Sequence, residues 1–220
     1  MRKITPLEYG KYYHIYNRGI NGEALFRSNE NYEHFLRLYE KYLEVVADTY
    51  AWCLLGNHFH LLVRIKEEDE IGFIPSKNKS SVNIKPPSGI KKTPMGKTSN
   101  RRRYKPSSQF SHLFNSYAQA FNKQHKRHGS LFESPFKRKY IDSERYFQDL
   151  ICYIHNNPVH HGFTTDALDY PWSSYQSIIS LKPTKLKRPE LQEWFGLTEN
   201  FVKYHNQKRD YMTIEKLIIE

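Results

Sequence analysis

Two short stretches of the chain place polar side chains where they could share one reaction. In the first, "NHFHLLV" (57–63), a single apolar residue separates His58 from His60. Alternate side chains of a β-strand point to the same face, so both imidazoles would face one way while Phe59 faces a core. Two neutral imidazoles on one strand are half of a site for a divalent metal ion. The pattern alone is weak, because eleven histidines in 220 residues would give roughly 0.5 such pairs by chance. Two surface histidines are the simpler interpretation.

The second stretch, "YIHNNP" (153–158), follows a run of helical periodicity. It places Tyr153 and Asn157 four positions apart, and therefore one turn apart on the same side of a helix. At the edge of the apolar stripe, the phenol could face a sheet surface rather than the core. Spacing alone favours a half-buried core tyrosine and a polar residue near the end of a helix. For the two stretches to share one reaction, the phenol of Tyr153 must lie within reach of a cation held by His58 and His60.

The elements that must position these residues are indicated by hydrophobic periodicity. We predict strands at 12–19, 49–55, 58–66 and 136–141, and helices at 28–47, 107–126 and 142–157, the last ending before Pro158. Gly56 and Asn57 suit the turn of a hairpin. This order predicts an α+β fold, with a ferredoxin-like antiparallel sheet, helices on one face and a small helical C-terminal extension.

Positive charge is concentrated in one segment. The net charge is +11, but residues 75–106 hold ten Lys or Arg and no acid, which leaves 24 basic and 23 acidic residues elsewhere. We predict that this segment is a basic, disordered insertion, which could be a solubilising linker or an arm that attracts nucleic acid. The folded domain would then comprise residues 1–74 and 107–180, and residues 181–220 would form the helical extension.

Composition also constrains the setting of the protein. The two isolated cysteines, Cys53 and Cys152, give no disulfide framework and no cysteine-rich metal site, which fits a reducing cytoplasm. The first residues lack the apolar stretch of a signal peptide, and no apolar run is long enough to span a bilayer. We therefore expect a cytoplasmic protein without a membrane partner.

Five stretches taken together resemble a known group of enzymes, the HUH single-tyrosine transposases, and specifically the REP-associated tyrosine transposases. They are "YHIYNRG", "LLGNHFHLLV", "YAQAFNKQHKRHGSLFESPFK", "YIHNNPVHHGF" and "DYPWSSYQS", in this order along the chain. Together they cover about residues 12–66 and 107–180. The chain departs from the pattern of the group in the length of its basic insertion, which affects the expected DNA path but none of the chemical residues.

The resemblance implies roles for individual residues. His58 and His60 would be metal ligands, Asn157 a third ligand, and Tyr153 the nucleophile that cuts single-stranded DNA and forms a 5′-phosphotyrosine link. Two histidines and an amide oxygen with open positions suit Mg²⁺ or Mn²⁺. Tyr117 is a weaker candidate nucleophile, because a phenylalanine lies four residues after it. Imidazoles must be neutral to bind metal, so we expect cleavage to weaken as the pH falls through about 6.

The DNA contacts are harder to predict. The basic candidates for phosphate contacts are Arg18, Lys137, Arg138, Lys139, Arg101, Arg102 and Arg103, and the aromatic candidates for stacking on bases are Tyr13, Tyr16 and Tyr140. Solvated basic residues and core aromatics explain each of them equally well. The family resemblance suggests a DNA hairpin or palindromic repeat with a single-stranded tail as the partner of a nucleoid-associated monomer or homodimer.

Two other functions are compatible with the same residues. An aromatic-rich ferredoxin-like sheet can bind single-stranded nucleic acid by stacking, without catalysis. A metallonuclease could use the same histidines with water as the nucleophile. It would release free 5′-phosphate ends and would not need Tyr153.

Overall fold

Four antiparallel strands form one sheet, in the spatial order β2-β3-β1-β4. The computed structural model describes residues 5–75, 102–196 and 198–207. The strands are β1 (Tyr12–Arg18), β2 (Ala47–Leu55), β3 (His58–Ile65) and β4 (Lys137–Tyr140). The helices are η1 (Ile20–Gly22), α1 (Asn29–Leu43), α2 (Pro106–Gln124), α3 (Glu144–His160), η2 (Ala167–Asp169), α4 (Tyr175–Ile179), α5 (Arg188–Phe195) and α6 (Thr198–Asn206). Up to β4, the order βαββαβ and the sheet order confirm the predicted ferredoxin-like α+β fold.

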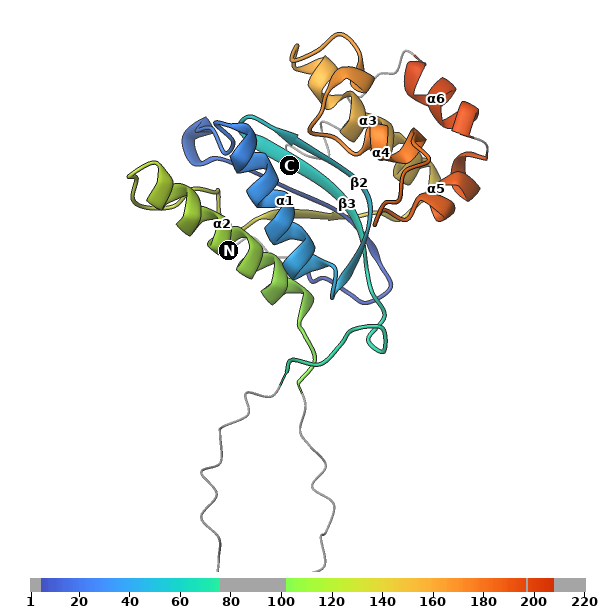
Figure 1. Ribbon diagram of the computed structural model, residues 1–220. Coiled ribbons are helices and arrows are strands. Elements are labelled where there is room, and N and C mark those ends of the chain that lie inside the picture. Colours follow the sequence, from blue (N-terminus) through green and yellow to red (C-terminus); the bar gives the residue numbers. More distant parts are fainter. Residues whose placement is uncertain (1–4, 76–101, 197, 208–220) are drawn as a thin grey trace, which may run out of the picture.

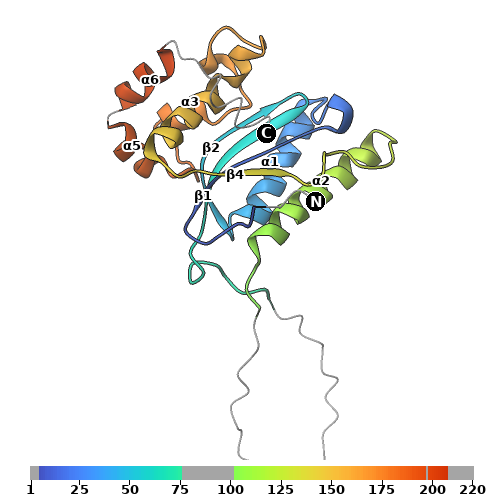
Figure 2. The same ribbon diagram turned by 180° about the vertical axis from the view of Figure 1, so that it is seen from behind.

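Helices cover both faces of the sheet, so the prediction that they lie on one face is wrong in part. Helices α1 and α2 pack on one face, as expected, whereas α3 lies on the other together with α4, α5 and α6 (Figures 1 and 2). The reason lies in β3, where Phe59 and Leu61 face α1 and α2 while Leu62 packs beneath α3. A strand that is apolar on both sides needs a cover on both sides.

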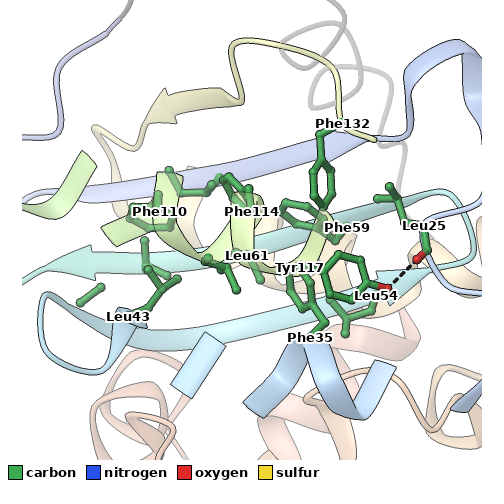
Figure 3. Packing of buried hydrophobic residues seen from close by; sticks show 14 of the residues in the cluster. Leu25, Phe35, Leu43, Leu54, Phe59, Leu61, Phe110, Phe114, Tyr117 and Phe132 are labelled. Atoms are coloured by element: carbon green, nitrogen blue, oxygen red, sulfur yellow. Dashed lines mark hydrogen bonds between the residues drawn. The ribbon is translucent and has the colours of Figure 1, made fainter. Parts of the chain in front are cut away.

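The core beneath α1 and α2 is largely aromatic. Phe35 of α1 and Tyr117 of α2 meet Phe59 of β3 in its centre, all three at 1% exposure or less (Figure 3). The Tyr117 hydroxyl donates a hydrogen bond of 2.6 Å to the carbonyl oxygen of Leu25, drawn as the dashed line in Figure 3. This tyrosine is therefore a core residue on the α1 and α2 face of the sheet.

Helix α3 runs past a proline that was predicted to end it. Ser143 caps its N-terminus by accepting a hydrogen bond from the backbone of Tyr146, and Pro158 lies inside the last turn. A proline inside a helix lacks the N–H that would bond four residues back. Only two residues of α3 follow Pro158, and the backbone N–H of His161 bonds the carbonyl of Asn157, so the helix closes beyond it. The predicted stripe of Phe147, Leu150, Ile151 and Ile154 is buried, as expected.

The basic insertion is shorter at its second end than predicted. Residues 102–106 are ordered: Arg103 pairs with Phe73 in an isolated β-bridge, and Pro106 is the first residue of α2. Residues 76–101 lie outside the described part of the chain, so their predicted disorder stays a prediction. At the C-terminus, the predicted short helices are α5 and α6, whose Leu191 and Phe201 share a buried cluster with α3. None of the described helices is long and apolar enough to cross a membrane.

Candidate active site

Strand β3 and helix α3 bring two of the predicted site residues into contact. His58 is the first residue of β3 and pairs with Arg18 of β1, while Asn157 lies in the last turn of α3. Because α3 covers the histidine-bearing face of the sheet, the Nε2 atom of His58 lies 3.2 Å from the Oδ1 atom of Asn157. These residues are 99 positions apart in the sequence, so the packing of α3 onto the sheet creates the site.

Tyr153 and His60 lie next to this contact. The ring of Tyr153 stands edge-on to the ring of His60, with 5.5 Å between their centroids. The rings of His58 and His60 are 5.2 Å apart, and the two histidines and Tyr153 line one cavity of about 620 Å³. Tyr153 is 6% exposed and lines this cavity, which is partly open to solvent. The four residues predicted for the chemistry are thus brought together.

His58 lies between two amide oxygens. Its Nδ1 atom is 2.7 Å from Oδ1 of Asn57, and its Nε2 atom faces Oδ1 of Asn157. A neutral imidazole has one N–H, so it can donate to only one of these acceptors. If Nδ1 carries the proton, Nε2 and the Asn157 oxygen present lone pairs to each other. A cation between them would satisfy both atoms.

His60 is held from behind by a third histidine. Its Nδ1 atom lies 2.9 Å from Nε2 of His14, a residue of β1 that is completely buried. The His60 side chain also lines the cavity, and its Nε2 atom has no hydrogen-bond partner among the described residues. The nitrogen that a metal ion would need is therefore the one directed away from His14.

The electrostatics keep these imidazoles neutral near pH 7. Burial lowers the pKa of His58 to about 4, with smaller lowering effects from His161 and Arg18, although its hydrogen bond to Asn157 acts in the opposite direction. Burial also lowers the pKa of His60 well below its ordinary value, and the neighbouring His14 and His58 lower it further. A metal ion requires neutral imidazoles, so these surroundings favour metal binding.

The donor set fits a hard divalent cation. Among the described residues, no group of three or more His, Cys, Asp or Glu side chains is arranged to hold a metal. The candidate set is instead His58 and His60, which line the cavity, and the buried amide oxygen of Asn157, which faces His58. Nε2 of His58 and Oδ1 of Asn157, which lie 3.2 Å apart, would supply one nitrogen and one oxygen donor to such an ion.

The basic residues predicted to contact DNA are divided between two faces. Arg18 and Lys137 line the cavity, and Lys139 lies on the same face of β4 as Lys137. Arg138 points to the opposite face, where its guanidinium lies 3.8 Å from the ring centroid of Phe136. The structure therefore does not bring Arg138 to the site.

The arginines at the end of the insertion are also far from the site. Arg103 donates a hydrogen bond to the carbonyl of Ile71 and lies over the ring of Phe73, beyond the C-terminal end of β3. The histidines are at the other end of this strand, about 23 Å away for seven steps of about 3.3 Å. Arg102 is exposed beside Arg103, and Arg101 lies outside the described residues.

The aromatic candidates separate in the same way. Tyr16 lines the cavity and stacks on His14, with 4.7 Å between ring centroids. Tyr13 belongs to the core under α1 and α2, and Tyr140 lies beside it at 40% exposure. Tyr16 alone of the three therefore remains a candidate for contact with a substrate.

Sequence reasoning missed three residues of the site. His14 shares the cavity-side face of β1 with Tyr16, and applying the alternation of side chains to "YYHIYNRG" would have found it. His161 and Phe163 line the cavity just after α3, where His161 is 5.1 Å from the ring of His58. Phe163 is 54% exposed. Both lie in the stretch "YIHNNPVHHGF" that was singled out in the sequence, but neither was given a role there.

Comparison with known proteins supports the fold. No protein-family model matches the chain, and no curated protein matches it in sequence. One solved structure, described as the REP-associated tyrosine transposase bound to a REP hairpin, superposes with a TM-score of 0.56. The match covers 83% of this chain and 88% of the other, at 14% sequence identity. At this identity the likeness shows that the two chains share a fold.

Proposed function

We propose that the chain is an HUH single-tyrosine enzyme that nicks and joins single-stranded DNA. The fold is that of a solved transposase, and the ordered sequence stretches that resemble this group place its chemical residues at His58, His60, Tyr153 and Asn157. The observation that carries the proposal is the meeting of a strand and a helix that are remote in sequence: His58, His60 and Tyr153 line one cavity, and the buried Asn157 contacts His58.

His58, His60 and Asn157 would hold Mg²⁺ or Mn²⁺. When bound, such an ion polarises a phosphate oxygen and offsets the charge that develops during phosphoryl transfer. The protein residues hold their donor atoms on a rigid strand and a helix end, which fixes the orientation of the scissile phosphate relative to Tyr153. Their neutral state near pH 7 keeps the nitrogen lone pairs available.

Tyr153 would act as the nucleophile. Its phenol gives up its proton as the oxygen attacks the phosphorus, and the bond from phosphorus to the 3′-oxygen breaks. The 3′-oxygen takes up a proton and becomes a free 3′-hydroxyl, so the step has no net change in protons. The phosphorus remains linked to the 5′ side of the DNA and to Tyr153. A phenol with an ordinary pKa of about 10 is a far better leaving group than an alkyl alcohol. A 3′-hydroxyl can therefore reverse the link and rejoin strands without a nucleotide cofactor.

The cavity walls suit a DNA strand. Arg18 and Lys137 offer positive charge to phosphates, and the half-exposed ring of Phe163 offers a face on which a base can stack. The solved neighbour is described as bound to a REP hairpin. We therefore propose a hairpin or palindromic repeat with an adjacent single-stranded tail as the substrate class.

Covalent capture tests the proposal. An oligonucleotide that carries a hairpin and a tail and is labelled at its 3′ end, the part that stays linked to the protein, is incubated with the protein and Mn²⁺, then run on a denaturing protein gel. We expect a labelled, metal-dependent adduct with wild-type protein and none with Tyr153→Phe, which should still bind the DNA. Tyr146→Phe is the matched control in the same helix, because its hydroxyl is buried without a hydrogen-bond partner among the described residues. It should form the adduct at the wild-type level.

The other outcomes identify the rival functions. An adduct that survives Tyr153→Phe would place the nucleophile elsewhere. Cleavage without any adduct, with free 5′-phosphate ends and no need for Tyr153, would indicate a hydrolytic metallonuclease. Tight binding without cleavage, on the DNA that flanks the gene of this protein, would indicate a non-catalytic single-strand binding protein.

A further inference from the structure

We propose that His14 is a positioning residue that sets the tautomer of His60, so that Nε2 of His60 is presented without a proton to a divalent cation. The inference rests on the proposed function, in which His60 is a metal ligand. His14 itself touches neither the cation nor the DNA. Its role would be to accept one hydrogen bond, and it would act only through His60.

The geometry of β1 and β3 brings the two rings together. Tyr16 lies opposite His60 in the register of the strands, and His14 lies opposite Leu62, so His14 and His60 are diagonal neighbours on one sheet face. Their nitrogen atoms, Nε2 of His14 and Nδ1 of His60, are 2.9 Å apart. The rings are 5.1 Å apart and inclined by only 25°. His60 is 3% exposed and His14 not at all, so no bulk water competes for this contact.

Counting protons gives the direction of the hydrogen bond. Two neutral imidazoles that face each other share one proton in their contact. If His14 donates it, His60 must carry its own proton on Nε2, which then points into the cavity and cannot ligate a metal. If His60 donates it, Nε2 of His60 is a bare lone pair. Only the second arrangement is compatible with metal binding, and it makes His14 the acceptor.

This arrangement leaves a buried polar atom of His14 unpaired within the described part of the chain, a cost in stability that an apolar residue at this position would avoid. When His14 accepts on Nε2, its proton is on Nδ1, and this atom is buried without a hydrogen-bond partner among the described residues. Native proteins seldom leave a buried polar atom unpaired, so each case calls for an explanation. An apolar ring would fill the same space and stack on Tyr16 without that cost. Orientation of a ligand is the explanation that this site offers, because partners of this kind commonly fix the tautomer of a metal-binding histidine.

The experiment compares two substitutions of His14 in the full-length protein. His14→Phe keeps the ring and removes the acceptor, whereas His14→Gln can keep an acceptor oxygen near the position of Nε2. Mn²⁺ alone is titrated into each protein and free Mn²⁺ is measured by electron paramagnetic resonance. We expect His14→Phe to bind Mn²⁺ about 10- to 100-fold more weakly than wild type, and His14→Gln to stay within a few-fold of wild type.

Two further readouts separate positioning from a role in folding. The thermal unfolding midpoint of metal-free His14→Phe should fall by only about 3 °C, because removal of the unpaired Nδ1 of His14 partly offsets the loss of the hydrogen bond from His60. Binding of a fluorescent single-stranded oligonucleotide in EDTA should be unchanged. If His14→Phe does not fold, His14→Leu, which also lacks an acceptor, replaces it in the comparison with His14→Gln.

The outcomes distinguish this inference from the proposed function. Equal Mn²⁺ affinity in wild type and His14→Phe would overturn the role of His14 and leave the proposed active site intact. Equal weakening by Phe and Gln, with a large drop in thermal stability, would also overturn it and assign His14 to the core. A wild-type protein that binds no Mn²⁺ would remove the metal from the proposed function and this inference with it.

Discussion

The molecule contains two buried histidine pairs with nearly the same geometry and different surroundings. His14 and His60 face each other at 2.9 Å in the sheet, and His155 and His205 face each other at 2.9 Å between α3 and α6. Both pairs have ring centroids 5.1 Å apart. The first pair borders the cavity, while the second is enclosed by the C-terminal helices.

The second pair is satisfied at every polar atom. Nδ1 of His205 donates to the carbonyl of Phe201, so its Nε2 accepts from His155, and the other nitrogen of His155 accepts from the hydroxyl of Ser174. That hydroxyl in turn accepts from the backbone N–H of Trp52. The first pair leaves one nitrogen of His14 unpaired and turns one nitrogen of His60 to the cavity. The complete chain of hydrogen bonds around His155 and His205 holds α6, α3 and β2 together. The incomplete chain around His14 and His60 leaves a nitrogen of His60 available to bind a ligand.

The largest expected effect comes from removing one histidine of each pair. His60→Ala should lower metal-dependent cleavage by roughly 10³-fold through loss of a metal ligand, and should leave the protein folded. His155→Ala should instead lower the free energy of unfolding by about 3–5 kcal/mol, since it leaves a cavity and unpaired partners in the core. Cleavage assays and urea unfolding of both variants measure the two effects.

The opposite pattern would break the comparison. A His60→Ala protein that cleaves normally but unfolds easily would make the sheet pair structural. A stable His155→Ala protein without cleavage activity would mean that the hydrogen-bonded chain around His155 contributes to catalysis. His205→Ala serves as an independent variant of the second pair, because it removes the same contact from α6 rather than from α3.

Two adjacent asparagines of α3 sharpen the same distinction. Oδ1 of Asn157 faces His58, whereas Nδ2 of Asn156 donates to the backbone carbonyl of His205. Asn157→Ala should reduce metal-dependent cleavage by about 100-fold, and Asn156→Ala should lower stability by about 1 kcal/mol with little change in cleavage. Mn²⁺ titration of both variants provides the check. Equal Mn²⁺ affinities would exclude Asn157 as a ligand.

The sequence predicts which of these side chains share a face better than it predicts how the helices cover the sheet. Alternation in β3 correctly separates His58 and His60 from Phe59, and helical spacing correctly places Tyr153 and Asn157 on one side of α3. Element order alone does not reveal which face of the sheet a third helix covers. That choice depends on the apolar residues of β3 on both faces, which bury α3 against the histidines.

Other predictions are wrong because one sequence pattern was applied without a second one that acts at the same position. Pro158 was expected to stop α3, but a proline near the end of a helix removes one hydrogen bond while packing of the helix persists. Arg138 and Lys137 were treated alike as basic residues, although neighbours in a strand point to opposite faces. Alternation in β1 places His14 on the same face as Tyr16, but its contact with His60 depends on the pairing of β1 with β3, which one strand does not reveal.

Acid should lower the free energy of unfolding, because the buried histidines are neutral in the folded protein. Burial lowers the pKa of His14 to about 3 and of His58 to about 4, and it lowers the pKa of His60 and His155 well below the ordinary value. The unfolded chain binds protons on these residues near pH 6.5, so their contribution to stability is full above that pH and is lost as the pH falls toward about 4. At pH 5, His14 and His58 would each have lost about 2 kcal/mol of stabilisation relative to neutral pH, and the lowered pKa values of His60 and His155 act in the same direction. Urea unfolding at pH 7.5, 6 and 5 measures this loss.

The same pKa values move the expected pH profile of cleavage. A decline through about pH 6 assumed ordinary imidazoles, and the buried His58 does not have an ordinary pKa. We now expect metal-dependent cleavage to persist to about pH 5, as long as the protein stays folded. Activity that halves near pH 6 in a protein that is still folded would contradict the lowered pKa values. His14→Gln removes one titrating group and should make the stability profile less steep.

The smallest expected effect concerns two neighbours on β4. Lys137 lines the cavity, and Arg138 lies on the opposite face against Phe136. Lys137→Ala should weaken binding of a single-stranded oligonucleotide by several-fold and reduce the slope of log affinity against log salt by about 0.7, since one phosphate contact is lost. Arg138→Leu should leave both quantities unchanged, because its guanidinium does not reach the cavity. Fluorescence anisotropy from 50 to 300 mM salt is the measurement. An equal effect of both substitutions would mean that DNA also crosses the α2 face of the sheet, and the cavity would then not be the main DNA-binding surface.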